Sequence, residues 1–321
     1  MTSAVDATAA SPLIRQMRES DIPIASAVFR RAFGTFLGLP DPDTFSADRE
    51  YLRGRWHADP TAALVAEVNG SLAGSNLATR WGSFAFFGPL TVEPALSNRG
   101  IAKMLLAATM EIIDGWRARD AALFTFSNST KHIHLYQGFG FWPRSLTALL
   151  SKPPVEHWGA SFDTFSPGGD SDRAATIDAC RGVADSVCPG LDLSSEIRVA
   201  YEQQLGETVL LWGRDSLDAF AVCYQGAGTE AGENTCYIKF AAARSGPRAQ
   251  SVFELLLRAC EVHALQCGLK RIEAGVNTAR SHAYRTMLRI GYRADSYGIA
   301  MHRNDSPAYN RPDCYVVEDL R

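Results

Sequence analysis

The two halves of the sequence repeat one order of strand-like and helix-like segments, and this repetition limits the folds that the chain can adopt. Residues 70–72 align with residues 215–217 at an offset of 145, and residues 126–128 align with residues 275–277 at an offset of 149. Four additional residues in the loop 225–234 account for the difference between the two offsets. A chain of 321 residues is about twice the usual length of one domain. The repetition therefore predicts two related domains.

Two consecutive prolines, Pro153 and Pro154, separate the two halves. Because consecutive prolines disrupt regular structure and stiffen a linker, we place the domain boundary there. The first dozen residues are small and polar, and they lack the basic start and the apolar stretch of a signal peptide. The predicted parts are a flexible N-terminal tail (1–12), a first domain (13–152), a second domain (153–306) and a C-terminal tail (307–321).

Composition narrows the class of function. With 46% hydrophobic and 21% charged residues, the chain is typical of a globular protein. A net charge of -3 without any Lys/Arg-rich run predicts no nucleic-acid partner. No stretch approaches the ~20 apolar residues of a membrane-spanning helix, so we expect no membrane partner. The seven cysteines form no C-x-x-C pair, which predicts reduced thiols, no metal site and a cytoplasmic location. We expect the protein to be a monomer or a homodimer.

The segments of the first half predict an α+β fold with a mixed, mostly antiparallel sheet flanked by helices. The strand 84–92 is interrupted by Gly88-Pro89, and because proline donates no hydrogen bond, we predict a β-bulge at this point. Apolar residues at helical spacing in 99–119, followed by a strand-like run at 122–126, predict a helix and a parallel strand. The other predicted elements are a strand at 13–18, a helix at 22–33, a short helix at 47–56, and strands at 62–68 and 72–79 that are joined by an Asn69-Gly70 turn.

The segment 90–103 consists of the end of a strand, a loop and the start of a helix, an arrangement suited to binding an anion. Free backbone N–H groups and the positive end of the helix dipole converge there. Gly100 and Ala102 remove side-chain bulk, so a pyrophosphate could approach the backbone, and Arg99 could add a positive charge. The alternative is a glycine that serves only the turn. The candidate binding residues are Leu90, Thr91, Val92, Ser97, Asn98, Arg99, Gly100, Ile101, Ala102 and Lys103.

This segment resembles the acyl-CoA-binding signature of the GNAT acyltransferase superfamily, in which a strand ending Val-x-Pro precedes Arg/Gln-x-x-Gly-x-Gly/Ala. Val92-x-Pro94 and Gly100-x-Ala102 match the signature, whereas Ser97 stands where the family prefers Arg or Gln. The resemblance implies acetyl-CoA or another acyl-CoA as co-substrate. It also implies two tandem GNAT-like domains, in each of which a bulged central strand splays from its neighbour and exposes backbone groups to pantetheine.

A second match lies downstream, where Asn128 is followed by Leu135-Tyr136 and then by a Gly-Phe pair. The resemblance implies that Asn128 helps to hold the pantetheine arm. It also implies that Tyr136 approaches the thioester sulfur as the general acid that protonates the leaving thiolate. A neutral phenol with a pKa near ~10 suits that role at neutral pH. The alternative is a core tyrosine whose hydroxyl is satisfied by the protein.

The general base is not fixed by the sequence. The strand position at which some family members carry a glutamate holds Phe86, which cannot accept a proton. Glu93 is close in sequence, but we interpret it as a cap of the helix entry. His132 lies one helical turn before Tyr136 and shares its face, whereas His134 is rotated away. His132 is therefore either a base or a surface or packed histidine.

Seven aromatic residues around the variable loop could line an acceptor pocket, or they could simply belong to the core. If some of them face the site, an apolar or aromatic acceptor is favoured over a polyanion. The seven residues are Phe33, Phe36, Trp56, Trp81, Phe84, Phe86 and Phe87.

The second half keeps the order of segments but loses the residues that carry chemistry. The counterpart of the glycine loop is Arg248-Ala249-Gln250-Ser251, without glycine. The acid position holds Met287, whose thioether cannot donate a proton, and Tyr284 lies about one turn earlier. We therefore predict that the second domain is a degenerate copy that supports the first.

The leading hypothesis is transfer of an acyl group from acyl-CoA to an amine of a small molecule or a protein, by direct attack within a ternary complex. The first half contains no cysteine, which disfavours a cysteinyl acyl-enzyme there. Two alternatives stay open, namely thioester hydrolysis or decarboxylation on the same fold and a non-catalytic acyl-CoA sensor.

Overall fold

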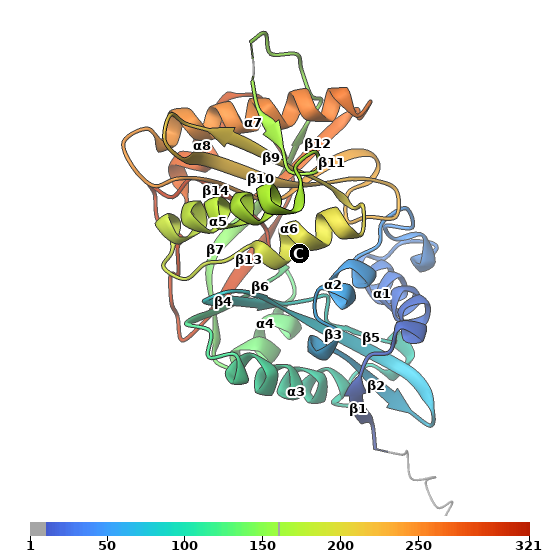
Figure 1. Ribbon diagram of the computed structural model, residues 1–321. Coiled ribbons are helices and arrows are strands. Elements are labelled where there is room, and N and C mark those ends of the chain that lie inside the picture. The colour runs from blue at the N-terminus through green and yellow to red at the C-terminus, as the bar shows by residue number, and fades with distance from the viewer. Residues whose placement is uncertain (1–10, 160) are drawn as a thin grey trace, which may run out of the picture.

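The computed structural model describes residues 11–159 and 161–321, so most of the predicted N-terminal tail lies outside the described residues. Figure 1 shows two stacked halves, each with helices packed on a sheet. The strands of the first half are β1 (Leu13–Gln16), β2 (Ala63–Val68), β3 (Ser71–Trp81), β4 (Phe84–Phe87), β5 (Thr91–Val92), β6 (Asp120–Phe126) and β7 (Phe141–Lys152). Its α-helices are α1 (Ile22–Leu37), α2 (Leu52–Ala58), α3 (Ile101–Gly115) and α4 (Thr130–Gln137).

The second half repeats the order of the first. Its strands are β8 (Asp163–Thr164), β9 (Gly206–Trp212), β10 (Leu217–Gly226), β11 (Gly232–Ala243), β12 (Arg271–Asn277), β13 (Arg293–Arg303) and β14 (Val316–Val317). Its helices are α5 (Asp170–Val187), α6 (Ser194–Glu202), α7 (Ala249–Gln266) and α8 (Ser281–Arg289). The predicted mixed, mostly antiparallel sheet flanked by helices is present in both halves. Among the helices of the described residues, none combines the length and the apolar character needed to cross a bilayer.

Three predicted elements differ in extent. The predicted helix 99–119 begins only at Ile101, because Gly100 takes a left-handed φ of 78° and cannot belong to a right-handed helix. The predicted strand 84–92 is divided into β4 and β5 by the Gly88-Pro89 interruption. The predicted short helix 47–56 lies further along the chain as α2.

The two halves exchange their last long strands. The order of the continuous sheet is β1-β2-β3-β4-β6-β13-β7-β12-β11-β10-β9-β8. Strand β13 of the second half pairs with β6 of the first half, and β7 of the first half pairs with β12 of the second half. The predicted boundary at 152–153 coincides with the end of β7, but the hydrogen bonding of the sheet crosses it. The division into two domains at this point stays a prediction.

Helices cover both faces of the first half. Phe29 of α1 and Leu52 of α2 pack with Val65 and Leu77 on one face of the sheet. On the other face, α3 contributes Leu105 to a cluster with residues of β2 and β3. Helices α1 and α3 therefore hold strands β3 and β5 from opposite sides, and β5 lies in the predicted binding segment.

Candidate active site

The predicted bulge is present between β4 and β5. Ala78 of β3 pairs with Phe87, whereas Ser75 of β3 pairs with Thr91. Three steps along β3 thus match four steps along the other strand, and the additional residue lies in the segment that contains Gly88-Pro89. Such a bulge bends its strand and leaves part of it unpaired.

The bent strand separates from its parallel neighbour. Strands β4 and β6 pair only from Phe84↔Asp120 to Phe86↔Ala122, and β5 beyond the bulge pairs with β3 and not with β6. The N–H of Glu93 donates to Ala73 of β3 at 2.8 Å, so by strand alternation the backbone groups of Val92 point away from β3. One strand edge in this part of the described structure is therefore open toward the gap beside β6.

The start of α3 adds free donors at the end of this open edge. The helix begins its hydrogen bonding with the N–H of Met104, which donates to Gly100 at 3.1 Å. The N–H groups of residues 98–103 have no acceptor among the described residues. A Cβ placed on Gly100 would meet no atom within 4 Å, so the space beside it is open. The turn is thus an uncovered cluster of N–H groups at the positive end of a helix.

The side chains of the predicted binding residues divide into two groups. Arg99 and Lys103 are exposed and form no ion pair among the described residues, so both remain available to an anion. In contrast, Ile101 packs in the core, and the Thr91 hydroxyl lies 3.1 Å from that of Ser75. These two residues can offer a ligand only their backbone groups. Asn98 has a left-handed φ of 66° and completes the turn, while Leu90 packs in the core below it.

Tyr136 lies beside the bulged strand. It is buried, and its ring packs against Phe87 at 5.8 Å between centroids. The hydroxyl makes no hydrogen bond among the described residues and is not fully enclosed. Burial raises the pKa of Tyr136 above its usual value, so the phenol is neutral at pH 7. Asn128 is exposed at the end of β6, on the other side of the gap.

Glu93 does not cap the helix entry as predicted. Its carboxylate binds Arg31 of α1 at 2.8 Å, and α3 has no side-chain cap. Because Arg31 lies on α1, more than sixty positions before Glu93, no local signal in the sequence indicated this ion pair. His132 is half-buried against Phe36, with 5.5 Å between ring centroids, and burial together with nearby Lys131 lowers its pKa. A neutral His132 is able to accept a proton.

Most of the seven aromatic residues belong to the core. Trp81, Phe84 and Phe86 are buried in the cluster that joins the two halves, and Phe87 lies in the core beneath α3 and α4. Phe33 and Phe36 differ, because both contact Phe126 at the end of β6: the Phe36 ring stacks on it at 4.9 Å between centroids, and the Phe33 ring lies tilted against it at 5.8 Å. Phe126 lies at the end of a strand predicted from the sequence, but it was not included among the aromatic residues of the predicted acceptor pocket.

Residues 28–141 match the sequence model of the acetyltransferase (GNAT) family. This segment is therefore similar to a GNAT acetyltransferase domain. The bulge, the splayed strand pair and the open helix start therefore lie within the matched segment of a GNAT domain. No protein of curated function matches the sequence.

Solved structures with the same fold cover between 91% and 98% of this chain. A putative acetyltransferase from Pyrococcus horikoshii is 16% identical with a TM-score of 0.67, and the match covers 98% of this chain and 96% of the other. A GCN5-related N-acetyltransferase from Sphaerobacter thermophilus is 15% identical with a TM-score of 0.62, covering 91% and 95%. A tandem GNAT protein from the clavulanic acid biosynthesis pathway is 13% identical with a TM-score of 0.55, covering 91% and 98%. At this level of identity the likeness establishes the fold alone.

The second GNAT copy lacks the polar features of the first. Helix α7 begins after Arg248, which has ordinary backbone angles and not those of a left-handed glycine. Met287 at the acid position is fully buried in the core. The Tyr284 hydroxyl lies 3.0 Å from the hydroxyl of Tyr297, on the exposed side of α8. Within the described residues, no group of three or more His, Cys, Asp or Glu side chains is placed to hold a metal ion.

Proposed function

We propose that the protein transfers an acetyl or other acyl group from acyl-CoA to the amine of a small molecule or a peptide. The observation that carries this proposal is the combination, in one copy only, of an open strand edge beyond a bulge with the uncovered N-terminus of α3. An extended thioester arm with a pyrophosphate at one end fits both features at once, because the strand edge offers backbone pairing and the helix start offers anion binding.

The proposed coenzyme contacts follow the strand into the helix. Residues 90–92 offer backbone groups to the pantetheine arm, and Asn128 approaches the arm from β6. The turn around Gly100 receives the pyrophosphate, with Arg99 and Lys103 as counter-charges. Ser97 provides a hydroxyl where an Arg or Gln would reach further, so we expect its contribution to be small. The complete proposed set comprises Leu90, Thr91, Val92, Ser97, Asn98, Arg99, Gly100, Ile101, Ala102, Lys103, Asn128 and Tyr136.

The proposed reaction is a direct attack. The amine nitrogen forms a bond to the thioester carbonyl carbon, the carbon–sulfur bond breaks, and the hydroxyl of Tyr136 donates its proton to the departing thiolate. The amine loses a proton to water or to neutral His132. The first half contains no cysteine that could carry the acyl group between two steps. Holding both reactants in one cleft is then the main source of rate.

The acceptor is proposed to enter from the side of α1. There the rings of Phe33 and Phe36 both contact Phe126 at the end of β6, and Phe36 also contacts half-buried His132. This aromatic group favours an acceptor with an apolar or aromatic part next to its amine. It offers little to a polyanion.

Release of free thiol from several acyl-CoAs, measured with and without a library of amines, tests the proposal. Amine-dependent release supports acyl transfer. Turnover without amine would instead indicate thioester hydrolysis or decarboxylation. This is the second candidate function, because Phe86 stands where some family members carry a glutamate. Binding of acyl-CoA without any turnover would make the protein a sensor.

A further inference from the structure

The second copy retains the bulged and splayed strand pair of the first. Cys223 of β10 pairs with Ile238 of β11, whereas Val222 pairs with Phe240, so Lys239 is the additional residue of a bulge. Strands β11 and β12 pair in parallel only as far as Ile238↔Ala274. Beyond this point β11 continues without β12, just as β5 continues without β6. A second cleft of the same construction therefore exists in the fold.

This second cleft is filled by residues 314–321. Ala241 and Ala242, two and three positions beyond the bulge, pair with Val317 and Val316 of β14. In the first copy, β5 corresponds to this part of β11, and the edge of β5 that faces away from β3 is open. A strand of the protein itself thus occupies the place that we propose for pantetheine in the first copy.

The segment also follows the course of a coenzyme at both ends. At its beginning, the hydroxyl of Tyr315 lies 3.2 Å from Gln250 in the first turn of α7, the helix that corresponds to α3. At its end, the carbonyl oxygen of Arg321 accepts a hydrogen bond of 3.4 Å from Lys239 at the bulge. The segment therefore runs from the helix start along the strand to the bulge.

Tight packing makes the segment a fixed occupant. Val316 and Val317 are fully buried, and Glu318 forms a buried ion pair with Arg280, whose side chain has no exposed surface. A Cβ on Gly275 of β12 would lie 2.1 Å from the Cβ of Asp319, so the glycine is needed for this close approach. Burial of this extent is comparable to that of a core strand.

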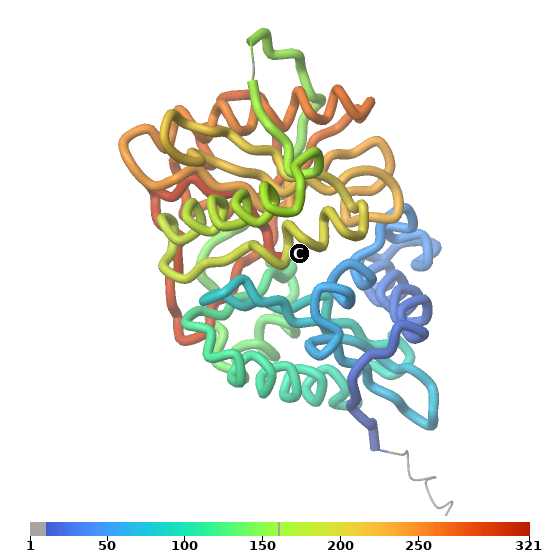
Figure 2. The backbone as a smooth tube through the Cα atoms, viewed as in Figure 1, coloured from blue at the N-terminus to red at the C-terminus, as the bar shows by residue number. Residues whose placement is uncertain are grey.

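The end of the segment reaches the first active site through one side chain. Figure 2 shows the C-terminal end of the chain between the two halves, where the carbonyl of Arg321 accepts a hydrogen bond from Arg55 of α2. Arg55 also donates to Glu230 of the second half at 2.9 and 3.1 Å. Its remaining terminal nitrogen donates at 2.6 Å to the carbonyl of Gly88, the residue at the bulge of the first copy.

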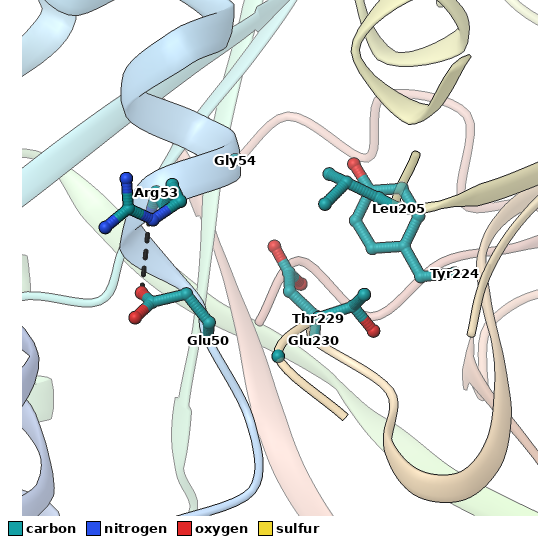
Figure 3. A pocket seen from close by; sticks show the side chains of 8 residues that line it. Glu50, Arg53, Gly54, Leu205, Tyr224, Thr229 and Glu230 are labelled. Carbon is teal, nitrogen blue, oxygen red and sulfur yellow. Dashed lines mark hydrogen bonds between the residues drawn. The ribbon is translucent and has the colours of Figure 1, made fainter. Parts of the chain in front are cut away.

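The surroundings of Arg55 hold it in this position. Its side chain is buried, and Glu230 is shared with Lys239 at 2.8 Å. Burial alone would raise the pKa of Glu230, but Arg55 and Lys239 outweigh burial and lower it, so the carboxylate stays ionised. Figure 3 shows Glu230 at the wall of a small pocket that residues of the α2 region form with the second half.

We infer that Arg55 is a positioning residue for acyl transfer, which fixes the peptide plane at Gly88 against the segment 314–321 of the second copy. The carbonyl of Gly88 cannot rotate without leaving the Nη1 of the buried Arg55 guanidinium without an acceptor, and the orientation of this peptide sets the direction of the strand edge that follows it. The second copy would thus contribute to catalysis by holding the bulge of the first. This inference rests on the proposed function, because it assigns a role at the same site.

The test compares Arg55→Met with Arg55→Lys, and with Arg53→Met as a matched control on the same helix. Arg53 is exposed, and its only ion pair within the described part of the chain is with Glu19 at 3.7 Å. A displacement of about 1 Å can cost about 100-fold in rate, so we expect kcat of Arg55→Met to fall by about 10- to 100-fold. The affinity for CoA should change less than about twofold, because the helix start is untouched. Arg55→Lys should recover part of kcat, and Arg53→Met should retain it.

Hydrogen exchange of the peptide that covers 84–92 gives a second readout that needs no activity. We expect faster exchange of this peptide in Arg55→Met than in the wild type or in Arg53→Met. If Arg55→Met does not fold, Gly275→Ala takes its place, since it displaces Asp319 and with it the segment 314–321 without changing any residue of the first half.

Two outcomes would overturn the inference. One is unchanged kcat and unchanged exchange of the bulge peptide in a folded Arg55 variant. The other is a lower thermal stability with equal changes in kcat and CoA affinity, as expected of a purely structural residue. A wild-type protein without any transfer activity would instead refute the proposed function, while the exchange experiment would still decide whether Arg55 holds the bulge.

Discussion

Replacing Tyr136 by Phe is the most direct test of the proposed chemistry, because it removes one oxygen and little else. The ring packs against Phe87, and this contact is retained in the variant. The hydroxyl makes no hydrogen bond among the described residues, so the free energy of unfolding should change by less than about 1 kcal/mol. General acid catalysis contributes about 10²–10⁴-fold, which corresponds to about 2.7–5.4 kcal/mol of barrier.

Single-turnover acyl transfer should therefore slow by that factor, while CoA affinity measured by calorimetry stays within about twofold. Because burial raises the pKa of Tyr136, the phenol stays protonated in the wild type, and the loss should be constant between about pH 7 and pH 9. Tyr292→Phe is the matched control, since this tyrosine of the second copy is fully buried and its hydroxyl also lacks a partner. Near-normal single-turnover rates in Tyr136→Phe would make Tyr136 a core aromatic and refute the assignment.

Three further predictions follow from the two clefts and their interface. Calorimetry should find one CoA site per chain. Gly100→Glu should weaken CoA binding about 100-fold or more relative to Gly100→Asn. Both substitutions place a side chain at a position with left-handed φ, but only Glu places a negative charge against the phosphates. A fragment limited to residues 1–152 should fail to unfold cooperatively by circular dichroism, since β6 and β7 lose β13 and β12; a stable, active fragment would contradict this. The pKa values of Glu230 and Glu273 are lower in the folded than in the unfolded chain, because the positively charged Arg and Lys side chains that contact them outweigh the effect of burial. The contribution of these two carboxylates to the free energy of unfolding should therefore be present above about pH 4.3 and lost as the pH falls below it. Thermal unfolding from pH 7 to pH 3 should show a smaller loss in Glu230→Gln, and an equal loss would contradict the assignment.

Local signals in the sequence were sufficient for the bulge after β4 and for the turn before α3. Gly88-Pro89 indicated the bulge, and Gly100 indicated the turn before α3, because each reflects a backbone requirement of its own position. The strand exchange left no such signal, since alternation of apolar residues shows which face of a strand is buried but not which strand lies beside it. For the same reason residues 307–321 were interpreted only as a tail, although Val316 and Val317 are fully buried in the sheet.

The interface between the halves was equally hidden from the sequence. Arg55 and Glu230 lie 175 positions apart, and each is unremarkable among neighbouring charged residues. Their pairing depends on the stacking of two halves, which no spacing within either half encodes. Only the degeneracy of the second copy, visible in Met287 and in the missing glycine before Ala249, pointed to a division of labour.

The two clefts differ chiefly in what completes the hydrogen bonding of their open edges. A bulged strand that leaves its neighbour exposes backbone N–H and C=O groups, and leaving such groups buried without partners costs about 1–3 kcal/mol each. In the second copy β14 supplies the partners permanently, so the edge at Ala241 and Ala242 has nothing left to offer a ligand. In the first copy no strand of the described residues covers the edge at Val92, which leaves it to water or to an extended substrate. We therefore propose that the duplicated fold confines the reaction to the first copy, while the second copy, closed by its own chain, supports the strand that carries the reaction.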